Sequence, residues 1–178
     1  MLRLIDGDDT AASSLSVAAL DEFIRMGESR VVSDFRSSLM MQGFAATPIN
    51  GQIGLPDDLL ELCVIHQDGR RLEFVGHERL NESEKFCTQL GNNLLVSGTG
   101  PVSITYYARP ADLITVLHPT FMRHRELYLY ATVLSAAMHM GLPQLDVWTA
   151  AYATQLQQAK RMERLAVTNG TPLRIRSR

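Results

Sequence analysis

The sequence has very little cysteine, lysine and tryptophan, and it contains no long run of apolar residues. Its two cysteines, Cys63 and Cys87, have no further Cys or His at the spacing of a zinc site, so we expect two free thiols in preference to a disulfide. No stretch approaches the roughly 18 apolar residues that a membrane-spanning helix needs, and the first residues are too short an apolar run for a secretory signal. We therefore expect a soluble protein that is made in the cytoplasm and has no membrane partner.

Motifs for common enzyme chemistry are also absent. The closest glycine pair, Gly98 and Gly100, lacks the lysine and the following helix of a phosphate-binding loop. No Gly-x-Ser-x-Gly or His-Glu-x-x-His motif occurs, and the five histidines are not spaced as metal ligands. The acidic residues 6–9 lack the glycine and the glutamate that complete a calcium loop. We therefore expect no enzymatic activity, no metal and no cofactor; a hydrolase with an unrecognised site is an alternative that no group of residues supports.

The charge of the chain is unevenly distributed. Hydrophobic residues make up 46% and charged residues 20%, which is typical of a globular protein. Residues 160–178 hold six basic side chains and one acidic side chain, whereas the rest holds eleven basic and eighteen acidic ones. Fifteen of the basic residues are arginine, the side chain that suits planar contacts at protein interfaces. This pattern predicts an acidic body with a basic C-terminal end.

Apolar residues at helical spacing predict three long helices. The first is expected over residues 14–42, beginning at Ser14 or Ser16 and ending at Gly43. The second follows Pro119 in the range 118–140, and the third covers 144–166. Because the link between the last two is short, we expect them to pack antiparallel. The residues predicted to face the core are Leu20, Ile24, Val31, Phe35 and Leu39, then Leu127, Tyr130, Leu134, Ala137 and Met138, then Trp148, Tyr152, Leu156, Ala159 and Met162.

Between the helices, residues 50–110 are rich in turns and short apolar runs. Residues 62–66 and 71–75 flank Asp68-Gly69, which is a strong hairpin signal. Residues 92–97 and 102–107 are expected to form a second hairpin around 98–101. The fold class predicted is α+β: mainly a helical bundle of about three long helices with a β-rich insertion of about four strands over 50–110. We expect one domain over 1–178, with helices in 14–42 and 118–166 and a C-terminal tail over 167–178.

The C-terminal tail alternates apolar and basic residues. Leu173 and Ile175 would point one way, and Arg174, Arg176 and Arg178 the other. Such a segment is either disordered or a strand that adds to the sheet edge of a partner, with the arginines contacting acidic groups. The tail can also touch nucleic acid, although it lacks aromatic residues to stack on bases.

The order of several short motifs resembles a known family. An N-terminal amphipathic helix with acidic and arginine residues is followed by Leu55-Pro-Asp-Asp-Leu-Leu-Glu61, which introduces the strands. A strand ending in Tyr106-Tyr-Ala-Arg-Pro110 closes them, and a helix reading Glu126-Leu-Tyr-Leu-Tyr-Ala131 precedes a last helix with Trp148 and Tyr152. Over about residues 15–165 this pattern resembles the phage head–tail adaptor (connector) proteins.

The resemblance implies a structural virion protein without catalysis or cofactor. In that family, copies of the chain are arranged in a ring, commonly a dodecamer. The ring joins the portal vertex to the tail and surrounds the channel for the genomic DNA. The implied partners are the portal protein, tail or nozzle proteins and further copies of the chain. The implied location is the neck or tail region of the virion, with assembly in the host cytoplasm.

Two groups of residues follow as candidate contacts. The portal-binding candidates are Leu173, Arg174, Ile175, Arg176 and Arg178. The candidates for contacts between subunits are Arg25, Arg30, Arg36, Arg123, Arg161 and Arg164. An acidic lining would repel DNA phosphates, so we expect the acidic body to face the channel at least in part.

Two other functions fit the same sequence. One is a tail-completion or neck protein further along the axis from portal to tail, which would also assemble as a ring. The other is a small DNA-binding regulator that uses the basic end, for which salt-dependent binding to duplex DNA is expected.

Overall fold

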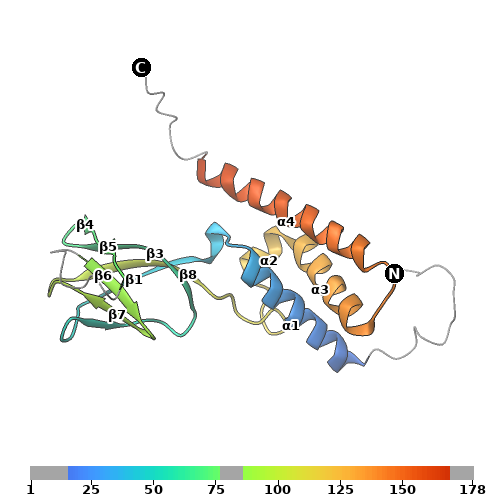
Figure 1. The fold of residues 1–178 in the computed structure, drawn as a ribbon, viewed down its shortest axis with the longest axis horizontal. Coiled ribbons are helices and arrows are strands. Elements are labelled where there is room, and N and C mark those ends of the chain that lie inside the picture. Colours follow the sequence, from blue (N-terminus) through green and yellow to red (C-terminus); the bar gives the residue numbers. More distant parts are fainter. Residues whose placement is uncertain (1–15, 77–85, 169–178) are drawn as a thin grey trace, which may run out of the picture. The chain divides into compact units, whose positions relative to one another are not determined.

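The computed structural model describes residues 16–76 and 86–168, and the chain divides into two compact units (Figure 1). The helical unit combines the described residues up to Phe35 with those from Ala111 onward. The β unit comprises Arg36–Pro110. The sequence predicted strands over 50–110, within this unit.

Three long helices and one short helix form the helical unit. They are α1 (Val17–Asp34), α2 (Pro119–Arg123), α3 (Arg125–Met140) and α4 (Leu145–Thr168). The core of the unit joins α1, α3 and α4, and its buried residues are Val31, Phe35, Leu127, Tyr128, Ala131, Leu134, Tyr152 and Ala159. The predicted stripes were therefore correct near their middle, while Leu20, Leu39, Met138 and Met162 are exposed.

Helix α1 begins as predicted but ends at Asp34, eight residues before the expected limit of 42. The Ser16 side chain accepts the N–H of Ala19 and caps the start. At the other end Phe35 has an extended backbone, and the Ser37 hydroxyl accepts the N–H of Leu39 in a short 3-10 turn, η1 (Ser38–Met40). The prediction of a helix to residue 42 was wrong because Phe35 continues the apolar spacing although the helix has already ended.

The helix predicted over 118–140 is interrupted at His124. There α2 ends, and α3 starts without a side-chain cap. Gly141 ends α3 in the left-handed conformation with φ of 62°, as the sequence predicted. Helix α4 then runs back along α3, because Glu163 near its end contacts His124 before the start of α3. The antiparallel packing of the last two long helices is thus confirmed.

The β unit holds two four-stranded sheets. The first has the order β1 (Met41–Ala46), β8 (Val102–Ala108), β3 (Leu59–Gln67), β4 (Arg70–Arg71). The second has the order β2 (Gln52–Gly54), β7 (Asn93–Val96), β6 (Phe86–Leu90), β5 (Glu73–Phe74). Neighbouring strands are antiparallel except β5 and β6, which are parallel. Buried residues of both sheets, among them Ile65, Leu94 and Ile104, form one core.

The turn of one predicted hairpin is confirmed, although its second strand ends at Arg71 and Glu73–Phe74 pairs in the other sheet; the other predicted hairpin is wrong. Strands β3 and β4 pair across Asp68 and Gly69, whose φ angles of 51° and 74° belong to a two-residue turn. Strand β7, however, pairs with β6 and β2, while β8 pairs with β1 and β3 in the other sheet. The turn at 98–101 therefore carries the chain between sheets, and the Gln67 amide donates to the Gly100 carbonyl at 3.0 Å where it crosses.

The α+β class is confirmed, but its predicted proportions are not. The described residues contain four helices and two sheets of four strands each, twice the number of strands expected. Gly43, which was expected to end a helix, lies inside β1 opposite Thr105. The chain is therefore not mainly a three-helix bundle. None of the helices within 16–76 and 86–168 combines the length and apolar character needed to cross a membrane.

Candidate assembly surface

A buried carboxylate of α1 holds the segment that leads into α2. Oε1 of Glu28 lies 3.3 Å from Nε2 of His118, and both side chains are almost fully buried. The other oxygen of Glu28 accepts the N–H of Leu113 at 3.1 Å. Nδ1 of His118 accepts the N–H of Phe121 and thereby caps α2. The contacts of Glu28 fix the segment 111–118 against α1.

A second buried carboxylate holds α4 against the junction of α2 and α3. Oε1 of Glu163 lies 3.2 Å from Nε2 of His124 and 3.3 Å from Nη1 of Arg123. The ring of Phe35 meets the His124 ring edge-on, with centroids 5.0 Å apart. Residues from the end of α1, the start of α3 and the end of α4 therefore meet at one point, which makes the helical unit a stiff body.

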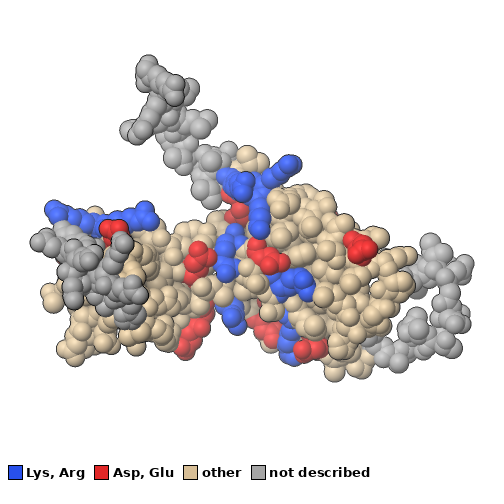
Figure 2. Space-filling model, viewed as in Figure 1, with Lys and Arg blue, Asp and Glu red and all other residues tan. Residues whose placement is uncertain are grey.

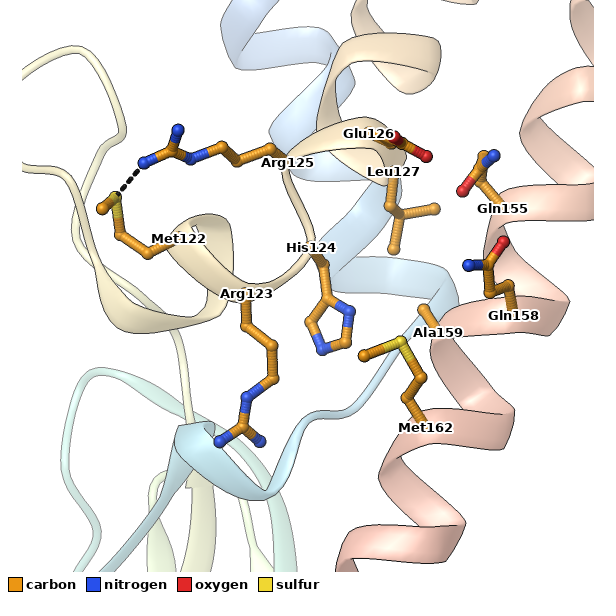
Figure 3. A pocket seen from close by; sticks show the side chains of 10 residues that line it. All are labelled: Met122, Arg123, His124, Arg125, Glu126, Leu127, Gln155, Gln158, Ala159 and Met162. Atoms are coloured by element: carbon orange, nitrogen blue, oxygen red, sulfur yellow. Dashed lines mark hydrogen bonds between the residues drawn. The ribbon is translucent and has the colours of Figure 1, made fainter.

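A hollow of about 330 Å³ lies beside this junction (Figure 3). Within it, Nη2 of Arg125 lies 3.4 Å from the sulfur of Met122, while the side chains of Gln155 and Gln158 approach from α4. The lining residues are Met122, Arg123, His124, Arg125, Glu126, Leu127, Gln155, Gln158, Ala159 and Met162. This set combines arginine, glutamine and methionine, which suit contacts with protein surfaces.

The two thiols have no features of a nucleophile. Burial raises the pKa of the Cys87 thiol to about 11. Burial also raises the pKa of the half-buried Cys63, and the nearby Glu61 carboxylate adds to this effect. Both groups therefore stay protonated at neutral pH, whereas a reactive cysteine has a lowered pKa. No group of three or more His, Cys, Asp or Glu side chains in the described part of the chain is arranged to hold a metal ion.

Arg25, the first of the arginines expected at subunit contacts, pairs within its own chain. Its Nε lies 3.3 Å from Oδ2 of Asp112. Oδ1 of the same carboxylate accepts the N–H of Ile114 at 2.9 Å. The hydrogen bond from the Ile114 N–H lowers the pKa of Asp112 below its usual range, and the guanidinium of Arg25 adds a smaller effect in the same direction. This pair is a second attachment of the segment 111–118 to α1.

Three further arginines also have contacts within the chain. Nε of Arg36 lies 3.4 Å from Oε2 of Glu61 inside the β unit. Arg123 pairs with Glu163 as described above, and Nη2 of Arg30 lies 3.3 Å from the sulfur of Met138. These contacts show what each side chain does in a single copy.

Arg161 and Arg164 lie on the exposed surface of α4. Figure 2 shows basic side chains gathered over the C-terminal part of this helix, where Lys160 adds a third positive charge. Exposed apolar side chains lie among them, since Met162 is 46% and Leu165 is 62% exposed. The basic end that the sequence predicted therefore begins on α4 itself. The predicted portal-binding residues 173–178 lie outside the described residues.

Sequence reasoning missed both buried carboxylates, although a signal for them exists. Glu28 follows Ile24 by four residues and precedes Val31 by three, so it lies on the apolar stripe of α1. Glu163 likewise follows Ala159 by four residues on the stripe of α4. An acidic residue at a core position of an amphipathic helix needs a partner, and a histidine is one of the few side chains able to supply it.

Comparison with known proteins places the chain in a family. None of the curated proteins compared with it matches. The family model described as SU10 adaptor protein matches residues 1–176, which is nearly the whole sequence. The expectation drawn from the order of its motifs is confirmed: the chain belongs to the SU10 adaptor protein family and is a structural adaptor component of phage particles.

Proposed function

We propose that twelve copies of the protein form a ring around the DNA channel, and that this dodecamer joins the portal vertex to the tail. The observation that carries this proposal is the match to the adaptor family over residues 1–176. An adaptor has to contact different proteins at its two ends, so its surfaces must differ from end to end. A ring further requires two different surfaces on each copy that bind each other and close on themselves.

The helical unit has the stiffness that such a role needs. Glu28 and Glu163 each connect elements far apart in the sequence through buried contacts with histidine. Because these contacts are buried, they are screened little by salt. A unit fixed in this way presents the same outer surface in every copy, which allows a regular ring to form.

Among the arginines proposed at contacts between copies, Arg161 is the strongest candidate. It is exposed on α4 and lies among exposed apolar side chains. Arg25, Arg36 and Arg123 have carboxylate partners in the same copy, and recruiting them would break those pairs. Their contribution across subunits is therefore expected to be smaller.

The portal is proposed to bind the C-terminal residues 170–178. Leu173 and Ile175 would fill apolar sites while Arg174, Arg176 and Arg178 bind carboxylates, as in strand addition to a sheet edge. The test is co-purification of tagged portal protein with the full chain, with a chain lacking 170–178, and with a control lacking residues 1–9, which removes the same number of residues from the other end. Loss of binding in the first deletion alone supports the proposal.

If the chain without 170–178 still binds portal as well as the full chain, the tail is not the portal-binding segment.

The acidic body of the chain is proposed to face the channel, so that DNA phosphates are repelled and the genome can slide. A potential map of the assembled ring tests this: a strongly positive channel surface would contradict it.

A further inference from the structure

Strand β1 leaves one edge of the first sheet without a neighbouring strand. It pairs with β8 at six consecutive positions, from Met41 opposite Tyr107 to Ala46 opposite Val102, without a bulge. Apart from the N–H of Met41, which donates to the carbonyl of Ser38, no backbone group on the outer side of β1 has a partner among the described residues. The strand therefore offers a row of free N–H and C=O groups to another strand.

The other free edges of the two sheets are protected, whereas β1 is not. Proteins protect edge strands by keeping them short, by placing charge on them or by a bulge. Strands β4 and β5 have two residues each and both carry charge, and β2 has three residues. The part of β3 that β4 leaves uncovered carries Glu61 and two register shifts. Strand β1 has six residues with no charged side chain and no proline, so it is open to pairing.

The side chains of β1 determine what kind of strand fits beside it. Phe44 and Ala46 pack against the core of the β unit, while Gly43 and Ala45 are exposed on the other face. Three of these four are small, so an added strand has room for larger apolar side chains next to the core. Neither β1 nor β8 carries a charged side chain, so basic groups on the outer face would meet no like charge on these two strands. The edge thus fits a strand of about six residues that is apolar on its core side.

One segment of the chain has this pattern. Residues 173–178 alternate apolar and basic side chains at their start and match β1 in length, whereas residues 1–5 are apolar on both sides. We propose that the segment 173–178 pairs with the outer edge of β1 in the protein that is free of portal. Leu173 and Ile175 then lie beside Phe44, and the three arginines point to the solvent. Two β1 strands facing each other would form a two-fold dimer, which does not repeat around a ring.

The inference goes beyond the proposed function, because it concerns the protein before it meets the portal. The segment 173–178 is also the proposed portal-binding segment, so strand addition to the portal requires its release from β1. Until then the pairing covers both a free sheet edge and a free strand, which are the features that lead to unspecific association.

Hydrogen–deuterium exchange of the free protein, without portal, tests the pairing. The full chain is compared with a chain lacking 170–178 and with a control lacking the same number of residues, 1–9. Without 170–178, the amides on the outer side of β1 are expected to exchange about tenfold faster or more, and the control is expected to match the full chain. The amides of β8, which lies between β1 and β3, are expected to stay protected in all three and report that the β unit is folded.

A full-length variant with Leu173→Asp and Ile175→Asp keeps the backbone but loses the apolar side, and its β1 is expected to exchange as in the deletion. Equal exchange of β1 in the full chain and in the chain lacking 170–178 overturns the proposal. Protection of β1 that remains without 170–178 and increases with protein concentration would assign the edge to a second copy, and it overturns the proposal as well. Because no portal is present, these outcomes do not depend on the proposed function.

Discussion

At the scale of single residues, two buried glutamates define the helical unit. Glu28 and Glu163 occupy core positions of amphipathic helices, where a carboxylate without partners costs several kcal/mol. Each lies close to a buried histidine; Glu28 accepts a hydrogen bond from the Leu113 N–H, and Glu163 is contacted by His124 and Arg123. Their positions therefore specify which elements pack together more sharply than apolar residues alone.

Replacing Glu163 by alanine is expected to destabilise the protein by about 2–4 kcal/mol, because His124 and Arg123 lose their shared carboxylate. The free energy of unfolding in urea measures this change. Gln157→Ala, on the exposed side of the same helix, serves as the control and should stay within about 0.5 kcal/mol of the wild type. A loss below about 0.5 kcal/mol for Glu163→Ala would show that the buried contact does not hold α4.

Replacing Tyr152 by phenylalanine is expected to have a pH-dependent effect. The Tyr152 hydroxyl donates to Oδ2 of Asp34 at 2.9 Å, and burial followed by this bond raises the pKa of Tyr152 above its usual value of 10.0. The pKa of this hydroxyl is therefore higher in the folded protein than in the unfolded chain. The stabilisation that results is fully present below pH 10 and is lost as the pH rises through the pKa of the folded protein. The variant should lose about 1.5–2 kcal/mol at pH 7.

The difference between Tyr152→Phe and the wild type should narrow at pH 11, since only the wild type has a tyrosine to ionise at this position. Urea unfolding at both pH values measures it. Tyr130→Phe removes a hydroxyl from α3 and should change the stability by less than about 0.5 kcal/mol at pH 7. A difference for Tyr152→Phe that is equal at both pH values would contradict the link to Asp34.

At the scale of elements, the contact between α1 and α3 depends on a missing side chain. A Cβ added at Gly27 would lie 2.6 Å from Oγ1 and 2.7 Å from N of Thr132. Alanine stabilises an exposed helix by about 1 kcal/mol relative to glycine, but here the backbone of α3 blocks it. Gly27→Ala is therefore expected to lower the melting temperature by several degrees.

Ser29→Ala on the exposed side of α1 is the control for this change, and it should leave the melting temperature unchanged or raise it slightly. If Gly27→Ala also raised the melting temperature, the close approach of α1 and α3 would not exist as described.

The elements also show how far the sequence leads. Helices α3 and α4 could be predicted because Gly141 ends one helix and a short link reverses the chain. The turn at Asp68 and Gly69 was equally clear. The end of α1 was not, since Phe35 keeps helical spacing in an extended backbone. Turn residues indicate where the chain reverses, but they do not indicate which strand becomes the partner. The predicted pairing of 92–97 with 102–107, now β7 and β8, was therefore wrong.

The candidate site could be predicted only in part. The surplus of arginine at the C-terminal end is visible in the sequence, and α4 displays Arg161 and Arg164 on its surface. The partners of Arg25 and Arg36 were not foreseeable, because Asp112 and Glu61 are brought near them only by the tertiary fold. Arginine content alone does not distinguish contacts within a copy from contacts between copies.

At the scale of the whole molecule, the chain combines a stiff helical unit, a β unit and a basic end. Membership of the SU10 adaptor protein family makes it a structural component of a phage particle. The buried pairs at Glu28 and Glu163 hold the helices together, and the end of α4 carries exposed basic and apolar side chains. These features agree with a subunit that repeats around an axis.

The most direct test of the ring between portal and tail is a cryo-electron microscopy reconstruction of the phage particle, together with a reconstruction of a particle that lacks this protein. The account predicts a closed ring of copies directly below the portal, absent from the second particle, with the tail detached. Density for the protein elsewhere in the particle, or a tail that still attaches without it, would contradict the account.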